Sequence, residues 1–150
     1  MLRINDMAQQ KIHFFSEDIA FNLKQKSLIR QWIKEAAREE GFSIRGDLNF
    51  IFCSDNYLLA INREYLNHQT YTDIITFDSS EEDGVLSGDI FISIPRINEN
   101  AIKFGVTDRD ELHRVMIHGV LHLCGYGDKS PVEKAGMTTK ENYYLAKRAL

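Results

Sequence analysis

The chain has 150 residues, a net charge of −4 and 43% hydrophobic residues. This length suffices for one domain with its own hydrophobic core and is short for two, so we expect a single domain over residues 1–150. No apolar run approaches the roughly 20 residues of a membrane span, and no secretory signal pattern opens the sequence. We therefore expect a cytoplasmic protein without a membrane partner. The negative charge argues against nucleic-acid binding through bulk positive charge.

Strand and helix patterns follow one another along the whole sequence. Hydrophobic spacing, runs of β-branched and aromatic residues, and capping residues together assign them. In chain order we expect a strand at 12–15, a helix at 27–40, a strand at 48–53, a helix at 55–66, strands at 73–77 and 88–94, and helices at 95–104, 107–124 and 132–148. This order predicts an α+β domain in which a small mixed β-sheet of about four strands is covered by helices.

Small polar residues and glycines mark the ends of the expected helices. Ser27 is expected to cap the first helix and Gly41 to end it. Thr107 or Asp108 is expected to cap the long helix in the C-terminal half, whose first turn is acidic, as the helix dipole favours. Gly125 can supply the left-handed stop of that helix. These ends determine which side chains share a face of each helix.

Two histidines one turn apart lie in the expected helix at 107–124, in the segment His118-Gly-Val-Leu-His122. A helix turns about 100° per residue, so side chains four residues apart lie on one face. The two imidazoles can therefore bind a single metal ion. By itself such a pair is a weak signal, because it also arises by chance. Gly119 strengthens it: glycine costs about 1 kcal/mol inside a helix, which indicates that something approaches that turn closely.

A third ligand is expected just after this helix. If Gly125 ends the helix, the chain can turn back and bring Asp128 toward the ion held by His118 and His122. Two histidines, one carboxylate and an open position make a catalytic type of site, whereas a structural site usually has four protein ligands. These ligand types favour zinc. The pattern is not the His-Glu-x-x-His motif of zinc peptidases, because Gly119 occupies the position of the glutamate.

Three segments of the chain resemble one known family. HGVLHLCGYGD at 118–128, followed by Glu133 and Met137, resembles the signature of the YbeY family. INREYLNHQTYTDIITF at 61–77 and SGDIFIS at 87–93 also match the pattern of that family. The three matches are specific as a set, so the chain is identified as similar to the YbeY family.

The resemblance implies a metal-dependent endoribonuclease that acts on single-stranded RNA. It implies a role in the maturation of ribosomal RNA, at the 3′ end of 16S ribosomal RNA, and in ribosome quality control. The implied partners are single-stranded ribosomal RNA and the ribosome or ribosomal proteins. The implied cofactor is one transition-metal ion per chain, with zinc favoured by the ligand types. The sequence identifies neither the oligomeric state nor the residue that moves protons.

The chain departs from the family pattern at two positions. Asp128 stands where the family has its third histidine, and aspartate is itself a competent zinc ligand. Either Asp128 completes the site with His118 and His122, or another group or water does. Leu66 stands where the family commonly has an arginine that assists catalysis or contacts RNA.

Six basic side chains are candidates for contact with the RNA substrate. Three lie four residues apart on the helix at 27–40, where they form either an ordinary solvated face or a row of phosphate contacts. Two arginines are candidates to compensate for Leu66, and one histidine lies in a polar loop. In sequence order the six are Arg30, Lys34, Arg38, Arg63, His68 and Arg96. Three other residues, His13, His113 and Cys124, are expected to lie away from the metal.

Two other functions stay open at this point. A non-catalytic ribosome-assembly factor with a structural metal would be consistent with the two departures from the family pattern. Such a protein would unfold without metal and cleave nothing. A metal hydrolase of another substrate, such as a peptide, is disfavoured because no glutamate follows His118.

Overall fold

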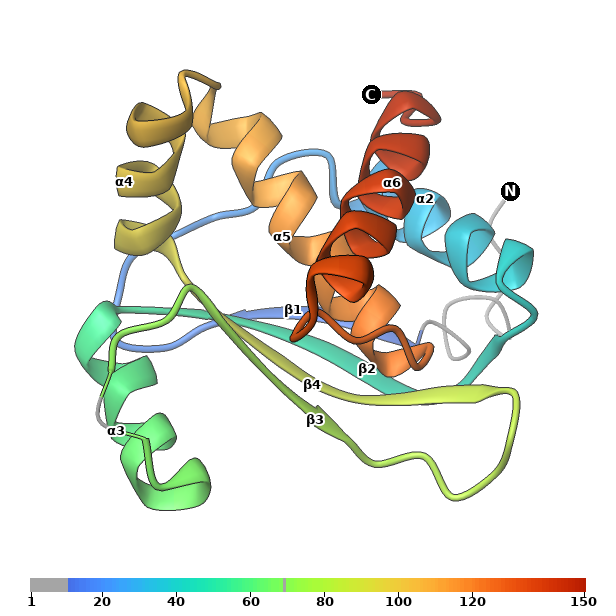
Figure 1. Cartoon of the computed structure of the whole chain (residues 1–150), viewed down its shortest axis with the longest axis horizontal. Coiled ribbons are helices and arrows are strands. Elements are labelled where there is room, and N and C mark those ends of the chain that lie inside the picture. Colours follow the sequence, from blue (N-terminus) through green and yellow to red (C-terminus); the bar gives the residue numbers. More distant parts are fainter. Residues whose placement is uncertain (1–10, 69) are drawn as a thin grey trace.

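A computed structural model describes residues 11–68 and 70–150 of the chain. Over these residues the chain forms a four-stranded sheet with helices on both faces (Figure 1). The strands are β1 (Ile12–Ser16), β2 (Ser43–Cys53), β3 (Ile74–Asp78) and β4 (Val85–Ser93), and the helices are α2 (Lys26–Glu39), α3 (Asp55–Leu66), α4 (Ile94–Phe104), α5 (Asp108–Leu123) and α6 (Pro131–Ala146). The α+β class, the small mixed sheet and its helical cover are confirmed.

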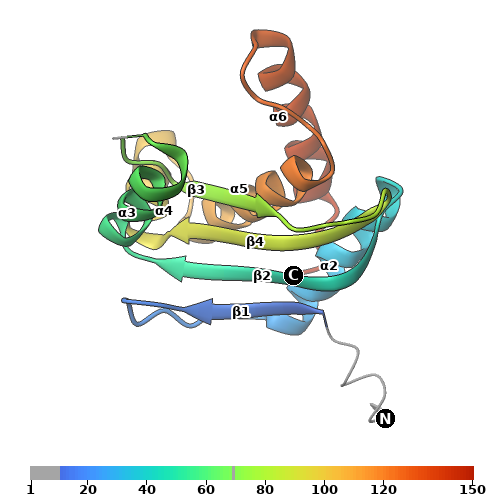
Figure 2. The same ribbon diagram turned by 90° about the horizontal axis from the view of Figure 1, so that it is seen from below.

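The strand order across the sheet is β1-β2-β4-β3. β1 and β4 both pair parallel with β2, whereas β3 pairs antiparallel with β4 at the edge of the sheet. Figure 1 shows α2, α4, α5 and α6 above the sheet and α3 below it, and Figure 2 shows α6 extending past the β3 edge. The helix that carries the two histidines, α5, packs on β3 and β4.

The main hydrophobic core lies between the sheet and the helices α2, α5 and α6. Alternate residues of β2 point into it: Leu48, Phe50 and Phe52 are at most 1% exposed. Burying a side chain of this size contributes about 1.5–3 kcal/mol relative to leaving it exposed. A smaller cluster, with Leu58 and Ile75 at its centre, lies under α3 on the other face. Among the described residues, no helix has the length and apolar character needed to span a bilayer.

Several boundaries differ from the prediction by one to five residues, and those at the starts of α2 and β2 have a clear structural cause. Helix α2 begins at Lys26, and its N-cap residue Gln25 has a left-handed backbone and no side-chain cap, so Ser27 is not the cap. β2 begins at Ser43, five residues before the predicted start, because its first residues pair with the start of β4. These residues alternate between exposed and half-buried, so hydrophobicity alone does not reveal them.

The cap at Thr107 and the glycines that follow α2 and α5 are as predicted. Thr107 caps α5 and Ser54 caps α3, and the side chain of each accepts a hydrogen bond from the backbone N–H group three residues further on. Gly41 and Gly125 follow α2 and α5 with left-handed backbones, at φ 89° and 104°. The turn at Gly125 lets the chain reverse direction after α5.

Gly119 brings α5 close to the sheet. A Cβ atom at this position would lie 2.9 Å from Cδ1 of Ile74 on β3 and 2.9 Å from Cγ2 of Ile90 on β4. The close approach predicted from the glycine is therefore confirmed. It places the neighbouring His118 in the same pocket as the residues of β3.

Replacing Gly119 with valine tests this contact. The added methyl groups would collide with Ile74 and Ile90, so we expect the free energy of unfolding to fall by about 1–3 kcal/mol. The matched control is Gly136→Ala on α6, where a Cβ meets no atom within 4 Å. There we expect about 0.5–1 kcal/mol of stabilisation, because glycine weakens a helix interior. Urea denaturation measures both, and an unchanged stability for Gly119→Val would contradict the packing.

Candidate metal centre

Two histidines and one aspartate meet at one point beside α5. Nε2 of His118 lies 3.3 Å from Oδ2 of Asp128, and Nε2 of His122 lies 3.2 Å from the same oxygen. The two imidazole rings are 4.5 Å apart and almost perpendicular, at 84°. Within residues 11–68 and 70–150, no other group of three or more His, Cys, Asp or Glu side chains brings its ligand atoms so close together. The three predicted ligands are thus brought together by the fold.

The spacing of these three atoms fits a transition-metal ion. Zinc binds imidazole nitrogen and carboxylate oxygen at about 2.0–2.2 Å, so the ligand atoms of a tetrahedral ion are about 3.3 Å apart. The two distances to Asp128 agree with that separation. The left-handed turn at Gly125 allows Asp128 to reach the helix face that carries the histidines. Nitrogen and carboxylate donors together suit zinc and related ions better than magnesium or calcium.

Each histidine is held through its second ring nitrogen. Nδ1 of His122 donates to the backbone carbonyl of Tyr126 at 2.8 Å, and Nδ1 of His118 lies 2.6 Å from Oε2 of Glu141 on α6. A carbonyl oxygen and a carboxylate can only accept, so both Nδ1 atoms carry the hydrogen. Both Nε2 atoms then present a lone pair toward Asp128, as metal-ligating histidines do.

Glu141 also sets the electrostatics of the site. Its side chain is 9% exposed and forms an ion pair with Arg114 at 2.9 Å. Burial disfavours the charged form of His118, but the hydrogen bond and the charge of Glu141 outweigh burial and raise the pKa of His118. Protons therefore compete with a metal ion for this imidazole as the pH falls.

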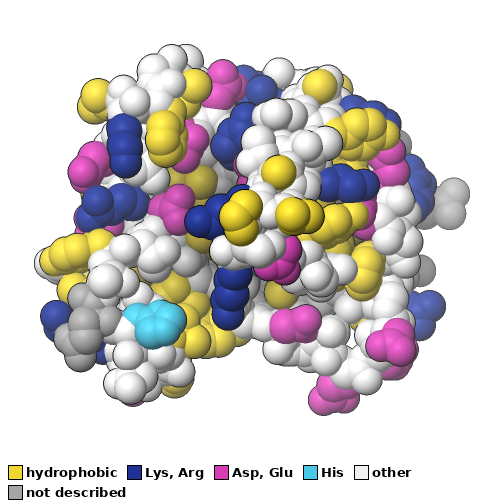
Figure 3. Space-filling model, viewed as in Figure 1, with side chains coloured by type: hydrophobic (Ala, Val, Ile, Leu, Met, Phe, Trp, Pro, Cys, Tyr) yellow, Lys and Arg dark blue, Asp and Glu magenta, His cyan; other side chains and the backbone are white. Residues whose placement is uncertain are grey.

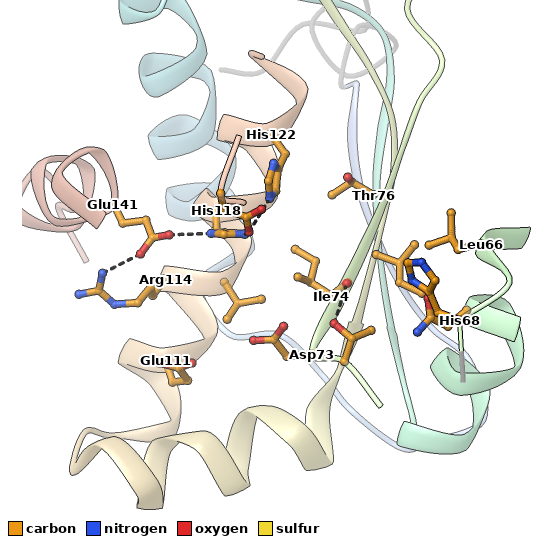
Figure 4. A pocket seen from close by; sticks show the side chains of 15 residues that line it. Leu66, His68, Asp73, Ile74, Thr76, Glu111, Arg114, His118, His122 and Glu141 are labelled. Atoms are coloured by element: carbon orange, nitrogen blue, oxygen red, sulfur yellow. Dashed lines mark hydrogen bonds and ion pairs between the residues drawn. The ribbon is translucent and has the colours of Figure 1, made fainter. Parts of the chain in front are cut away.

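The three ligand residues line a pocket of about 500 Å³. Figure 4 shows Glu111, Arg114, His118 and His122 along one wall, formed by α5, with the β3 strand facing it. The space-filling view shows the molecule hollowed between its α3 side and its α6 side, with Lys and Arg side chains along the hollow (Figure 3). The side chains of His118, His122 and Asp128 are 19%, 24% and 39% exposed within this pocket, so a substrate can reach the metal centre.

Two residues singled out by the sequence lie on the wall opposite α5. His68 and Leu66 both line the pocket, at the end of α3 and in the loop after it (Figure 4). The histidine is thus placed where it can contact a substrate. The hydrophobic side chain of Leu66 is 42% exposed, so this part of the wall offers no positive charge to a substrate.

The five other candidates for substrate contact do not line this pocket. Nε of Arg30 donates to the carbonyl of Ile12 at 2.8 Å. Lys34 and Arg38 border a separate hollow on the α2 side of the molecule. Arg96 forms an ion pair with Asp55 at 2.9 Å, and Arg63 is exposed on α3.

The remaining histidines and Cys124 lie away from the metal centre, as predicted. Nδ1 of His113 accepts a hydrogen bond from Arg148 at 2.8 Å on another side of α5, and His13 pairs with Asp47 at 3.2 Å. Burial raises the pKa of the Cys124 thiol to about 12, so this side chain is a neutral thiol at ordinary pH.

The sequence-based reasoning missed four charged residues of the pocket: Asp73, Glu111, Arg114 and Glu141. The sequence contains a signal for three of these residues, Glu111, Arg114 and Glu141. Glu111 and Arg114 precede His118 by two turns and about one turn, so they belong to the same helix face. Glu141 is a charged residue in a buried stripe of α6, between Met137 and Tyr144.

The sequence also matches known proteins over most of its length. The model of the family described as Endoribonuclease YbeY matches residues 11–149. The chain belongs to the endoribonuclease YbeY family. The YbeY endoribonuclease of Cytophaga hutchinsonii is 51% identical over 142 residues, which are 95% of this chain and 99% of that protein. That of Flavobacterium psychrophilum is 48% identical over 131 residues, which are 87% of this chain and 92% of that protein.

A solved structure also resembles this YbeY-family chain. The solution structure of TM1509 from Thermotoga maritima superposes with a TM-score of 0.63 and 27% sequence identity, covering 91% of this chain and 87% of that one. The family and the enzyme class predicted from the three sequence segments, an endoribonuclease, are confirmed.

Replacing Glu141 with glutamine tests how the first histidine is held. The amide keeps the shape of the side chain but removes the charge that orients His118. We expect metal affinity at neutral pH to fall by about 10–100-fold. Without that charge the pKa of His118 should also fall, so the decline of metal affinity with falling pH should begin at a lower pH than in the wild type.

Competition with a chromogenic chelator over a pH series measures both effects. Glu64→Gln, at an exposed position of α3 outside the pocket, is the control and should match the wild type. Unchanged affinity in Glu141→Gln would mean that Glu141 does not support the metal centre.

Proposed function

We propose that this endoribonuclease cleaves single-stranded ribosomal RNA at a zinc ion held by His118, His122 and Asp128. In this proposal it acts in ribosomal RNA maturation, at the 3′ end of 16S ribosomal RNA, and in ribosome quality control. Its partners are the RNA and the ribosome or ribosomal proteins. Family membership supports the RNA substrate, and the convergence of three ligand atoms at one point supports the metal.

The observation that carries the proposal is that the three ligands face an open pocket. Three protein ligands leave one position of a tetrahedral ion free, which is the arrangement of catalytic zinc sites. Structural zinc sites are instead closed by four protein ligands. This difference favours an enzyme over an assembly factor with a structural metal.

The residues around the ligands have separate tasks in this proposal. His118, His122 and Asp128 would hold the ion, which would supply Lewis acidity toward a phosphate oxygen and toward a water molecule. Glu141 and the carbonyl of Tyr126 keep both imidazoles in the ligating tautomer. Arg114 holds a positive charge on the same wall, fixed by Glu141 and by Asn142 at 2.7 Å.

The pocket suits an unpaired strand. Its volume of about 500 Å³ is typical of sites for small ligands and accommodates a few flexible groups rather than the width of a duplex. His68, on the wall opposite the metal, can hydrogen-bond or stack with a base, as side chains that bind single-stranded RNA do. The row Arg30, Lys34 and Arg38 lies outside this pocket and would contact only a more distant part of the RNA.

The net charge of −4 favours guidance by a partner. An RNA-binding protein that acts alone is usually basic, because phosphate contacts supply much of its affinity. Docking on the ribosome or on ribosomal proteins would raise the local concentration of RNA without a basic surface.

Metal content and cleavage of a single-stranded ribosomal RNA fragment, measured side by side for wild type and His122→Ala, test the function. We expect the wild type to hold about one metal ion per chain and to cut, because three protein ligands define one site. The variant should stay folded, lose the metal and cut no faster than background. The control His13→Ala, on β1, should behave as wild type.

Either of two outcomes would contradict the proposal. If the wild type holds metal but cuts nothing, with or without ribosomes, the assembly-factor function takes its place. If His122→Ala cuts as well as the wild type, the metal centre is not the site of cleavage.

A further inference from the structure

We propose that Glu111 and Asp73 hold a second divalent cation, of the oxygen-preferring Mg²⁺ class, on the floor of the pocket. This cation would bind an RNA phosphate near the one that is cleaved. The inference rests on the proposed function, because it takes RNA as the occupant of the pocket.

Glu111 is buried yet lacks a partner. It lies on α5 two turns before His118, about 10 Å along the helix axis. The residue is 4% exposed and lines the pocket. In the described part of the chain, no hydrogen-bond donor or cationic side chain pairs with its carboxylate. In the described residues, every side-chain oxygen that is fully enclosed has a hydrogen-bond partner. Because the carboxylate of Glu111 has none, its oxygens are not fully enclosed and open onto the pocket.

Asp73 supplies a second carboxylate to the same floor. It immediately precedes β3, and Figure 4 shows it projecting toward α5. Its one side-chain hydrogen bond in the described residues is long, 3.5 Å from Nδ2 of Asn100 to Oδ2. Burial raises the pKa of Glu111, and the charge of Asp73 raises it further, which is consistent with two neighbouring carboxylates.

The charge of the pocket favours the binding of a second cation when RNA enters. Four carboxylates line it, those of Asp73, Glu111, Asp128 and Glu141, against the single arginine Arg114. With neutral histidines and one divalent ion at the metal centre, the lining retains one negative charge and repels a phosphate. A second divalent cation makes the lining positive.

The ligand types of the two sites select different ions. Magnesium is typically held by one or two carboxylates, several waters and substrate phosphates, which Glu111 and Asp73 can satisfy. Imidazole ligands favour zinc instead. Glu111 lies about 10 Å along α5 from His118, which exceeds the separation of about 3.5–4 Å between the ions of a two-metal centre. The second cation would therefore position the strand rather than act on the bond that breaks.

Binding of Mn²⁺ to the full-length, zinc-loaded protein, followed by electron paramagnetic resonance, tests the inference. Mn²⁺ serves as a probe for Mg²⁺, and zinc content is measured before and after the titration. The RNA is a 2′-O-methyl oligoribonucleotide, which cannot use its own hydroxyl as a nucleophile. We expect the RNA to tighten Mn²⁺ binding by about tenfold, and Mg²⁺ to tighten RNA binding by a similar factor, because coupling between two ligands is reciprocal.

Three variants locate the effect. Glu111→Gln and Asp73→Asn should each abolish the Mn²⁺ site and the effect of Mg²⁺ on RNA binding, while zinc content and thermal unfolding stay as in the wild type. Glu64→Gln on the exposed face of α3 should change neither. Two variants are used so that one poorly folded protein does not decide the result.

Several results would overturn the inference. If the wild type binds no Mn²⁺ beside its zinc, or if both variants keep the Mn²⁺ site, then Glu111 and Asp73 hold protons instead of a cation. RNA cleavage that persists without any effect of Mg²⁺ on RNA binding would refute the second cation and leave the proposed function intact. Mn²⁺ binding without RNA binding would refute the phosphate contact and the proposed function together.

Discussion

Close packing of α5 on the β3–β4 pair determines where the functional groups of this protein lie. The contact exists because residue 119 has no side chain, so the helix backbone approaches Ile74 and Ile90 directly. The polar face of α5 then borders a pocket whose other walls are β3 and the end of α3. A bulkier residue at position 119 would move this whole face, including both histidines, away from the sheet.

A second set of contacts keeps the ligands in one orientation. The backbone carbonyl of Tyr126 accepts from His122, while the hydroxyl of the same tyrosine donates to Glu40 at 2.6 Å. Glu40 follows α2 and also accepts from Lys140 of α6 at 3.0 Å. Burial opposes ionisation of Glu40, but these hydrogen bonds lower its pKa overall and keep it charged. The loop that carries Asp128 is thus tied to two helices outside the pocket.

The metal ligands could be predicted from the sequence because they are local. His118 and His122 lie one turn apart on a helix with clear capping signals. Gly125 predicts the turn after this helix, which brings Asp128 back toward the histidines. Glu141 could not be paired with His118 in the same way, because the contact depends on how α6 packs against α5. The position of Glu111 was readable from helical spacing, but its lack of a partner was not.

The same distinction explains the row of basic residues on α2. Helical spacing shows that Arg30, Lys34 and Arg38 share a face, but it does not show which way that face points in the folded domain. Helix α2 packs on β2, and two of these side chains border a hollow away from the metal centre. Likewise, the first part of β2 was missed because its pairing with β4, rather than its hydrophobicity, makes it a strand.

X-ray absorption spectroscopy of the zinc-loaded, full-length protein tests the metal centre most directly. The account predicts two imidazole nitrogens and one carboxylate oxygen at about 2.0–2.2 Å, with the remaining position taken by an exchangeable oxygen. Its spectrum should contain no sulfur contribution. A shell at about 2.3 Å, which indicates a cysteine ligand, or a spectrum with a single imidazole would contradict the assignment of His118, His122 and Asp128.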